Sequence, residues 1–382
     1  MQSAHIILTT AILITLTTSV FLIVWSRKTL LVGEQPSRLM AFIAILFTSG
    51  LDVGLILFPL TEFPVYEAES VYAFTNPLAI EFGFWGFLVW GFYFLTTFYF
   101  CVVEPRLKLF EIGWVKMINN LVIIGTCAFT GFLFFSYLPD YIADIPEVAR
   151  YALVAVVVLA AVISSTDIRL VIWLSIGSFL LFLALITAML MHSDMRVEQF
   201  VQSGQYLGGY FRNLHRFVSP LTDYHAFYLF WWFAWSIMIG QFVARFVGGL
   251  RPWQLLAALL VLPSIPIALW FSILFHVHSQ EIPLTGFLQI SMIVVGIIFV
   301  INSLDSLTRL YSENLNLTVE RLGRSLYIAI HWGLLFGLIL LYQFTPLKIE
   351  WIGMVVILLY ACIYALIFQR RRQLTAASFQ RV

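Results

Sequence analysis

The chain has 382 residues, of which 61% are hydrophobic and 11% are charged, with a formal net charge of +1. Ordinary soluble domains carry about 25% charged residues, so this composition excludes a water-soluble protein and indicates an integral membrane protein. The small net charge gives no indication of nucleic-acid binding. The three cysteines, Cys101, Cys127 and Cys362, lie far apart in apolar runs, which predicts neither a disulfide framework nor a metal cluster.

Apolar segments follow one another along the whole chain, and most have about the 20 residues that a helix needs to cross a bilayer. The first one lacks the basic region and cleavage site of a signal peptide, so we interpret it as a retained span. The sequence therefore predicts an all-α integral membrane protein with about 11 transmembrane helices. The predicted spans are residues 4–25, 38–60, 80–103, 115–137, 147–164, 168–191, 223–248, 253–277, 284–311, 323–344 and 350–369.

A polar stretch at residues 194–218, DMRVEQFVQSGQYLGGYFRNLHRFV, interrupts this series. It is too polar to cross a bilayer, and its aromatic residues are interspersed with arginine. That pattern is typical of an amphipathic helix lying in the headgroup layer, in contact with membrane lipid. We predict such an interfacial helix on the outer side, with a plain connecting loop as the alternative.

Basic residues fall in alternate loops, which sets the predicted orientation because cytoplasmic loops carry an excess of Lys and Arg. The N-terminus is then outside and the C-terminus cytoplasmic, and we expect the plasma (bacterial inner) membrane. The intervening loops are mostly acidic. The basic loop residues are Arg27, Lys28, Arg38, Arg106, Lys108, Lys116, Arg169, Arg251, Arg321, Arg324, Arg370, Arg371 and Arg372, and the acidic ones are Glu62, Glu67, Glu69, Asp140, Asp144, Glu147 and Glu281.

Two segments are rich in aromatic residues: FWGFLVWGFYF at 84–94 and FYLFWWFAW at 227–235. On a helix, the two tryptophans and the tyrosine of the first segment fall on one face. Indole faces bind a quaternary ammonium through cation–π attraction, about 0.5–2 kcal/mol per ring, and through apolar contact. Packing or lipid-facing surface is the alternative interpretation. The candidate rings are Trp85, Trp90, Tyr93, Trp231, Trp232 and Trp235.

Four motifs, in the same order along the chain, resemble those of the betaine/choline/carnitine transporter family. The segment 227–275 begins FYLFWWFAWSIMIGQFVARF and is similar to the family pattern FYWAWWxxWxPFVGxFIAR. FWGFLVWGFY at 84–93 resembles HWGxHxWxxY, with Phe84 in place of the histidine. LFTSGLDVGLILF at 46–58 resembles LFSAGMGIGLxF, and IFVINSLDS at 298–306 resembles FFxTSADS. The chain is identified as a shortened and divergent member of this family.

The resemblance implies a leucine-transporter-type inverted repeat of five plus five helices with one extra N-terminal helix. Family members usually have twelve helices and longer tails, so we expect this chain to lack the first helix and a long regulatory terminus. Homotrimers are common in the family, which makes a homotrimer the expected assembly. The expected units are an accessory helix at 1–30, a first repeat at 31–193, the interfacial helix at 194–218, a second repeat at 219–370 and a cytoplasmic tail at 371–382.

The resemblance also implies that an aromatic cage binds the substrate. In this sequence the cage positions are Trp85, Trp90, Tyr93 and Trp232. Trp231 and Trp235 would be neighbouring pathway aromatics, and Leu229 replaces a family tryptophan.

Asp52 lies near the middle of the second predicted span, where a bare carboxylate is costly and is expected to be neutral, paired or bound to a cation. Gly50 and Gly54 flank it and permit an unwound segment whose carbonyls face a substrate or ion. Three interpretations of Asp52 stay open: a proton carrier, a ligand of sodium or of a positive substrate group, and a structural ion pair with a basic side chain.

The family's sodium site would fall on the backbone near Leu51 and on Phe299, Asn302 and Ser303. Asn302 replaces a threonine there, and an amide oxygen is a hard ligand suited to sodium. Coupling to sodium, coupling to a proton and uncoupled exchange remain alternatives. We expect no other cofactor.

No phosphate loop, zinc-binding helix or nucleophile motif occurs in the sequence, so no enzyme is predicted. The sequence predicts a secondary active transporter of a quaternary-ammonium or methylated-amine solute, working by alternating access around the cage. One alternative is a transport-inactive membrane subunit or sensor within a larger complex. Another is an amino-acid or other amine transporter with the same fold and a different cage.

Overall fold

The computed structural model describes residues 2–39, 42–43, 46, 53–142 and 144–373. In this part of the chain, ten helical segments are long and apolar enough to cross a membrane. The structure therefore confirms the prediction of an all-α membrane protein. Part of the predicted span at 38–60 lies outside the described residues. Its last residues belong to α3, Val53–Ala68.

The remaining helices agree closely with the predicted spans. The first half contains α1 (Gln2–Trp25), α4 (Pro77–Trp85), α5 (Leu88–Phe98), a π-helical turn (Tyr99–Val103), α6 (Glu104–Leu107), α7 (Gly113–Tyr141), α8 (Glu147–Ser165) and α9 (Ile168–Ser193). After α10 (Val197–Arg212), the second half contains α11 (Asp223–Phe246), α12 (Pro252–Val261), α13 (Ser264–Ser279), α14 (Gly286–Leu315), α15 (Val319–Leu322), α16 (Arg324–Phe344) and α17 (Ile349–Gln369). Short 3-10 turns occupy Ser70–Tyr72, Leu109–Glu111, Leu214–Arg216 and Arg371–Gln373.

Two predicted spans are broken in the middle. The span at 80–103 consists of α4 and α5, and the span at 253–277 consists of α12 and α13. These are the second spans of the two predicted repeats, and the inverted repeat itself stays a prediction. The predicted spans run through both breaks, because the mean hydropathy of each segment stays high over a full span.

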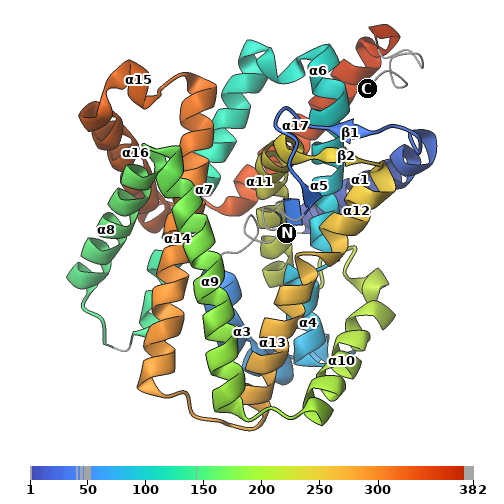
Figure 1. Cartoon of the computed structure of the whole chain (residues 1–382). Coiled ribbons are helices and arrows are strands. Elements are labelled where there is room, and N and C mark those ends of the chain that lie inside the picture. The colour runs from blue at the N-terminus through green and yellow to red at the C-terminus, as the bar shows by residue number, and fades with distance from the viewer. Residues whose placement is uncertain (1, 40–41, 44–45, 47–52, 143, 374–382) are drawn as a thin grey trace.

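The two halves of the chain are packed into one bundle (Figure 1). α11, from the second half, lies against α5 and α17. α14 lies against α7, α8 and α9 of the first half. The halves therefore share one core, in which the aromatic segments of α4, α5 and α11 are buried.

A two-stranded antiparallel sheet was not predicted. β1 (Leu31–Val32), just after α1, pairs with β2 (Gly248–Leu250), just after α11. Further along, the Gly33 N–H donates to the carbonyl of Val247 at 2.8 Å. A Cβ atom at Gly33 would approach the Ala244 carbonyl oxygen to 2.0 Å, so the close approach of these two backbone segments requires glycine here. The sheet fixes the segment that leads toward the second predicted span onto the end of α11.

The predicted interfacial segment contains a helix, α10, followed by the 3-10 turn at Leu214–Arg216. α10 packs against α4 and α13 and lies at the opposite end of the bundle from α6 and α15 (Figure 1). Phe200 and Phe211 on α10 are exposed, which suits contact with lipid headgroups. The helix replaces the plain-loop alternative, and its location in the membrane interface stays a prediction.

Candidate functional site

The break between α4 and α5 shapes the aromatic site. α4 ends at Trp85, Gly86 is extended, and Phe87 has φ 47° and ψ −88° before α5 begins. A bulky residue at positive φ is strained by about 1–3 kcal/mol and persists only where its surroundings hold it. Here the Phe87 N–H donates to Ser264 Oγ of α13 at 2.8 Å, and the Leu88 N–H donates to Tyr210 Oη of α10 at 3.2 Å.

The N–H groups of two indoles donate hydrogen bonds to backbone carbonyls that have no helical partner because of the break. A helix ends with carbonyl oxygens that have no partner within the helix. Trp232 Nε1, on α11, donates to the Phe84 carbonyl at 2.7 Å, and Trp90 Nε1 donates to the Trp85 carbonyl at 3.1 Å. The ends of both indoles are thereby fixed by the broken backbone.

The four predicted cage rings meet around Trp232. Its ring centroid lies 5.7 Å from that of Trp85, 6.4 Å from Trp90 and 6.1 Å from Tyr93. The Trp85 and Trp232 rings are perpendicular, at 89°. All four side chains are at most 6% exposed. The rings face the protein interior and one another, and the lipid-facing alternative is wrong for them.

The rings do not converge because they share one helix face, as the sequence analysis predicted. Trp85 belongs to α4, whereas Trp90 and Tyr93 belong to α5, so they do not lie on one continuous helix. The break and the approach of α11 bring the rings together. Their role in binding stays a prediction.

The two remaining aromatic candidates lie in different places. The Trp231 ring stacks on Trp232 at 6.0 Å and lies 5.4 Å from Trp85, so it adjoins the cage. Trp235, one turn further along α11, lines a separate cavity of about 60 Å³ together with Ser175, Asn302 and Ser303.

That cavity lies at the predicted sodium site. Ser175 Oγ of α9 donates to Asn302 Oδ1 of α14 at 2.8 Å, which leaves this oxygen one further lone pair. Phe299 is fully buried and its ring packs on Phe182 at 5.8 Å, so only its backbone is suited to an ion. The side-chain oxygens of Asn302 and Ser303 are hard ligands that fit sodium.

The other predicted coupling residues belong to the second predicted span. Gly50, Leu51 and Asp52 lie outside the described residues. Gly54 lies in the first turn of α3, not in an unwound segment. A Cβ atom there would approach Trp85 Cη2 to 2.6 Å, so glycine at this position makes room for the indole. In the described part of the chain, no group of three or more His, Cys, Asp or Glu is placed to hold a metal ion.

The sequence analysis missed two buried carboxyl groups, one of which lies on the same helix as Trp85. Glu81 lies on α4, one turn before Trp85, and is fully buried; Tyr66 Oη donates to its Oε2 at 2.7 Å. Glu62, assigned above to an outer loop, lies within α3 and is 7% exposed, and Tyr224 Oη donates to its Oε1 at 2.6 Å. A charged residue inside an otherwise apolar span was the signal that could have found Glu81.

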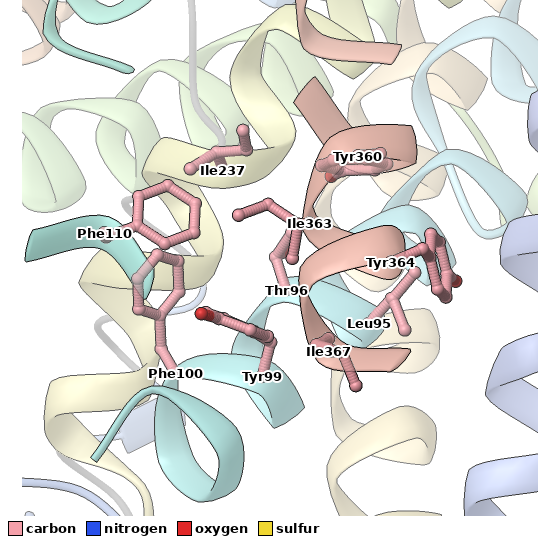
Figure 2. A pocket seen from close by; sticks show the side chains of 10 residues that line it. All are labelled: Leu95, Thr96, Tyr99, Phe100, Phe110, Ile237, Tyr360, Ile363, Tyr364 and Ile367. Carbon is pink, nitrogen blue, oxygen red and sulfur yellow. The ribbon is translucent and has the colours of Figure 1, made fainter. Parts of the chain in front are cut away.

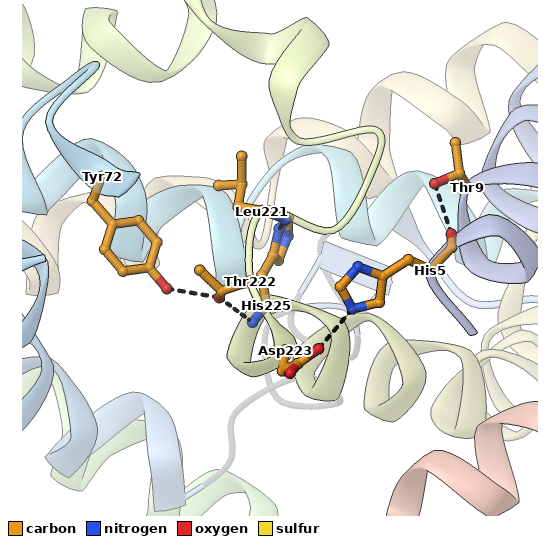
Figure 3. Close-up of polar contacts among 7 residues, drawn as sticks. All are labelled: His5, Thr9, Tyr72, Leu221, Thr222, Asp223 and His225. Carbon is orange, nitrogen blue, oxygen red and sulfur yellow. Dashed lines mark hydrogen bonds and ion pairs between the residues drawn. The ribbon is translucent and has the colours of Figure 1, made fainter. Parts of the chain in front are cut away.

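A layer of side chains covers the cage on the side of α10. Tyr72 Oη and Thr222 Oγ1 are hydrogen-bonded at 2.9 Å, and the same Thr222 oxygen accepts the His225 N–H at the start of α11 (Figure 3). The His225 ring stacks on Phe84 at 4.4 Å. His5 of α1 pairs with Asp223 at 2.9 Å and ties the accessory helix to this end of α11 (Figure 3).

A polar cavity lies at the opposite end of the bundle. A cavity of about 430 Å³ is lined there by residues of the β1 segment, the α5–α7 connection and the end of α11. Three amide oxygens facing this region, Asn119 Oδ1, Asn120 Oδ1 and Gln241 Oε1, are buried without a hydrogen-bond partner in the described part of the chain. Such groups are normally satisfied by water or ligand.

A smaller cavity between α5, α11 and α17 is unsuited to a charged solute. It measures about 60 Å³ and is lined by apolar and aromatic side chains, among them Leu95, Ile237 and Tyr360 (Figure 2). A water molecule takes up about 30 Å³ in the liquid, so the space is far below that of a typical ligand pocket.

Comparison with known proteins gives relatives along most of the chain. The glycine betaine transporter OpuD of Bacillus subtilis (strain 168) is 22% identical over 445 residues, which cover 90% of this chain and 82% of that protein. The high-affinity choline transport protein of Escherichia coli (strain K12) is 23% identical over 299 residues, 65% of this chain and 44% of that protein. An uncharacterized transporter of Mycobacterium tuberculosis, Rv0917, is 32% identical over 100 residues, 24% of this chain and 16% of that protein.

A search against protein-family models found no match. The relatives nevertheless confirm the resemblance read from the four motifs, and they are transporters, as predicted for this chain. The chain is thus a multi-pass membrane transport protein similar to the betaine/choline/carnitine transporters, and not an enzyme.

Proposed function

We propose that this protein is a secondary active transporter of a quaternary-ammonium or methylated-amine solute, of the betaine, choline or carnitine class. The observation that carries the proposal is the meeting of Trp85, Trp90 and Tyr93 around the Trp232 indole. The relatives named as transporters of glycine betaine and of choline support the same substrate class.

A trimethylammonium group has no N–H to donate, so the site recognises it by ring faces. Each indole or phenol face contributes about 0.5–2 kcal/mol of cation–π attraction, together with apolar contact with the methyl groups. The rings are now in mutual contact, with Trp85 and Trp232 perpendicular at 5.7 Å. Binding therefore requires α11 to move away from the ends of α4 and α5, and the cage opens only around its ligand.

Alternating access is the proposed mechanism. The hydrogen-bonded layer of Tyr72, Thr222 and His225 covers the cage on one side, while the cavity of about 430 Å³ opens at the other end. In this proposal the layer is the closed barrier of one of the two states that alternating access requires, and the cavity is its opening to solution. The return state would separate Tyr72 from Thr222 and close the inner cavity.

The proposal includes three alternatives for coupling: coupling to sodium, coupling to a proton, and uncoupled exchange. Asn302 and Ser303 supply the oxygens that sodium would use, while Asp52 is the candidate proton carrier. Imposing sodium and pH gradients in turn on proteoliposomes distinguishes the three. Asp52→Asn removes pH dependence alone if Asp52 carries protons.

Uptake of labelled choline and glycine betaine into proteoliposomes tests the function. Trp232→Ala is expected to abolish uptake, whereas Trp173→Ala, which removes a 72% exposed tryptophan from α9, is expected to leave it unchanged. Equal loss in both variants, or full activity of Trp232→Ala, would contradict the cage.

The second candidate is a transport-inactive membrane subunit or sensor. It is favoured by the direct packing of the four cage rings on one another, which needs no ligand to fill the space. Absence of uptake of any methylated amine by the wild-type protein, with a membrane partner that co-purifies, would support it. A third candidate, transport of an amino acid or another amine, predicts uptake that neither choline nor betaine competes with.

A further inference from the structure

Glu81 places a carboxyl group directly beside the aromatic cage. It lies four residues before Trp85 on α4, so the two side chains share a helix face about one turn apart. Glu81 is 0% exposed and Trp85 is 1% exposed. A carboxyl group buried in a membrane span is expected to be neutral, paired or bound to a cation.

The two residues also share unsatisfied hydrogen-bonding capacity. Glu81 Oε2 accepts from Tyr66, but Oε1 has no hydrogen-bond partner among the described residues, and neither has Trp85 Nε1. A buried acceptor and a buried donor, about one turn apart on the same helix and both without a partner by hydrogen-bond geometry among the described residues, fit one hydroxyl group, whose O–H donates to the carboxylate and whose oxygen accepts the indole N–H.

The electrostatic surroundings favour a positive ligand. Neither Glu81 nor Glu62 forms an ion pair with any Lys, Arg or His of the described residues. The hydroxyl groups of Tyr66 and Tyr224 donate one hydrogen bond to each carboxyl. A ligand that brings a net positive charge supplies the missing counter-charge, whereas a ligand carboxylate would face a second carboxylate at close range.

Resting on the proposed function, we propose that Glu81 and Trp85 form a hydroxyl-binding subsite that selects a net-cationic quaternary-ammonium alcohol over a zwitterion bearing a carboxylate. The trimethylammonium group would lie against the faces of Trp85, Trp90, Tyr93 and Trp232. The hydroxyl end would then lie one helical turn away, between Glu81 Oε1 and Trp85 Nε1. The two relatives named for glycine betaine and for choline leave this choice open.

The test compares binding and uptake of choline, glycine betaine and ethyltrimethylammonium, which has the charge of choline but no hydroxyl. Purified protein is titrated with each while tryptophan fluorescence is recorded, and proteoliposome uptake is measured in parallel. The wild type is expected to prefer choline to both other compounds. Glu81→Gln, which removes the charge at nearly constant size, is expected to lower the choline-to-betaine ratio by at least about tenfold, and Glu81→Asp to retain most of it.

The matched control is Glu67→Gln. Glu67 lies on α3, which packs against α4, but its side chain is 51% exposed and contacts His278. This control is expected to leave the ratio unchanged. Should Glu81→Gln fail to fold, Tyr66→Phe removes the bond to Oε2 and is expected to change the same ratio.

The outcomes separate the two proposals. A wild type that prefers betaine, or a choline-to-betaine ratio unchanged in Glu81→Gln, overturns the subsite while leaving cage-based transport intact. Equal binding of choline and ethyltrimethylammonium overturns the hydroxyl contact. Absence of binding of all three compounds overturns the proposed function and the subsite with it.

Discussion

Trp232 Nε1 donates a hydrogen bond of 2.7 Å to the carbonyl oxygen of Phe84, a residue 148 positions earlier in the chain. The acceptor is free because α4 ends one residue later, at Trp85. The position of the central indole is therefore set by a break in a helix of the other half of the chain. Binding by the cage and the integrity of this break are expected to be coupled.

Replacing Trp232 by phenylalanine tests the contribution of the indole N–H separately from that of the aromatic face. Trp232→Phe keeps an aromatic face but leaves the Phe84 carbonyl buried without its partner, which costs about 1–3 kcal/mol. We expect a lower Tm in detergent and a higher KM for uptake. Trp351→Phe, at a tryptophan that is 55% exposed on α17, serves as control. An unchanged KM in Trp232→Phe would show that the hydrogen bond does not position the ring.

A methyl group at Gly54 is expected to displace the Trp85 indole. In Gly54→Ala the added Cβ would lie 2.6 Å from Trp85 Cη2 in the present arrangement, so ring or helix must shift. Overpacking of this kind costs about 1–3 kcal/mol. Uptake should fall severalfold. Gly333→Ala on α16, where a Cβ meets nothing within 4 Å, should keep uptake and stability, and a matching loss in both variants would contradict the steric argument.

Ser264 supports the strained residue at the break. Ser264→Ala removes the acceptor of the Phe87 N–H, and a buried unsatisfied donor costs about 1–3 kcal/mol. We expect a lower Tm and weaker ligand binding measured by tryptophan fluorescence. Ser291→Ala removes a hydroxyl that bonds only the Phe287 carbonyl of its own helix, and it should change neither quantity. Normal ligand binding by Ser264→Ala would show that the break holds without this bond.

The cavity at the end of α11 predicts a pattern of thiol labelling. Cys101 and Cys127 are buried and Cys362 is exposed, so Cys362→Ser gives a suitable background. In that background Gln241→Cys, which lines the cavity, should react with a water-soluble maleimide. Ser236→Cys, one and a half turns earlier on the same helix and 0% exposed, should not. Choline is expected to alter the rate at Gln241→Cys, and equal rates at both positions would contradict an accessible cavity at this end of α11.

Much of the helical framework could be predicted from the sequence. Apolar runs of span length separated by polar breaks gave the ends of α7, α8, α9, α16 and α17 to within a few residues. The runs are visible because a helix in lipid must be apolar along its whole length. The breaks within α4–α5 and α12–α13 were not predicted, because Gly86 and Pro263 interrupt segments whose mean hydropathy stays high over a full span.

The aromatic residues of the candidate site were predicted, but the carboxyl groups beside them were not. Trp85, Trp90, Tyr93 and Trp232 were found from their type and from motif spacing. Glu81 was overlooked because one acidic residue barely alters the hydropathy of its span, and Glu62 because it was assigned to a loop. The distances from these carboxyl groups to the tyrosines depend on α3, α4 and α11 coming together, which no local pattern encodes.

Composition and periodicity alone determined that this chain lies in a membrane as a bundle of helices, since burial of so much apolar surface has no other stable solution. The motifs shared with the betaine/choline/carnitine transporters indicated which residues carry ring faces suited to a methylated cation. Only the tertiary structure decided that these rings meet. The Trp232 indole donates to the broken backbone, while Ser264 and Tyr210 accept from its N–H groups, and these bonds join segments more than a hundred residues apart.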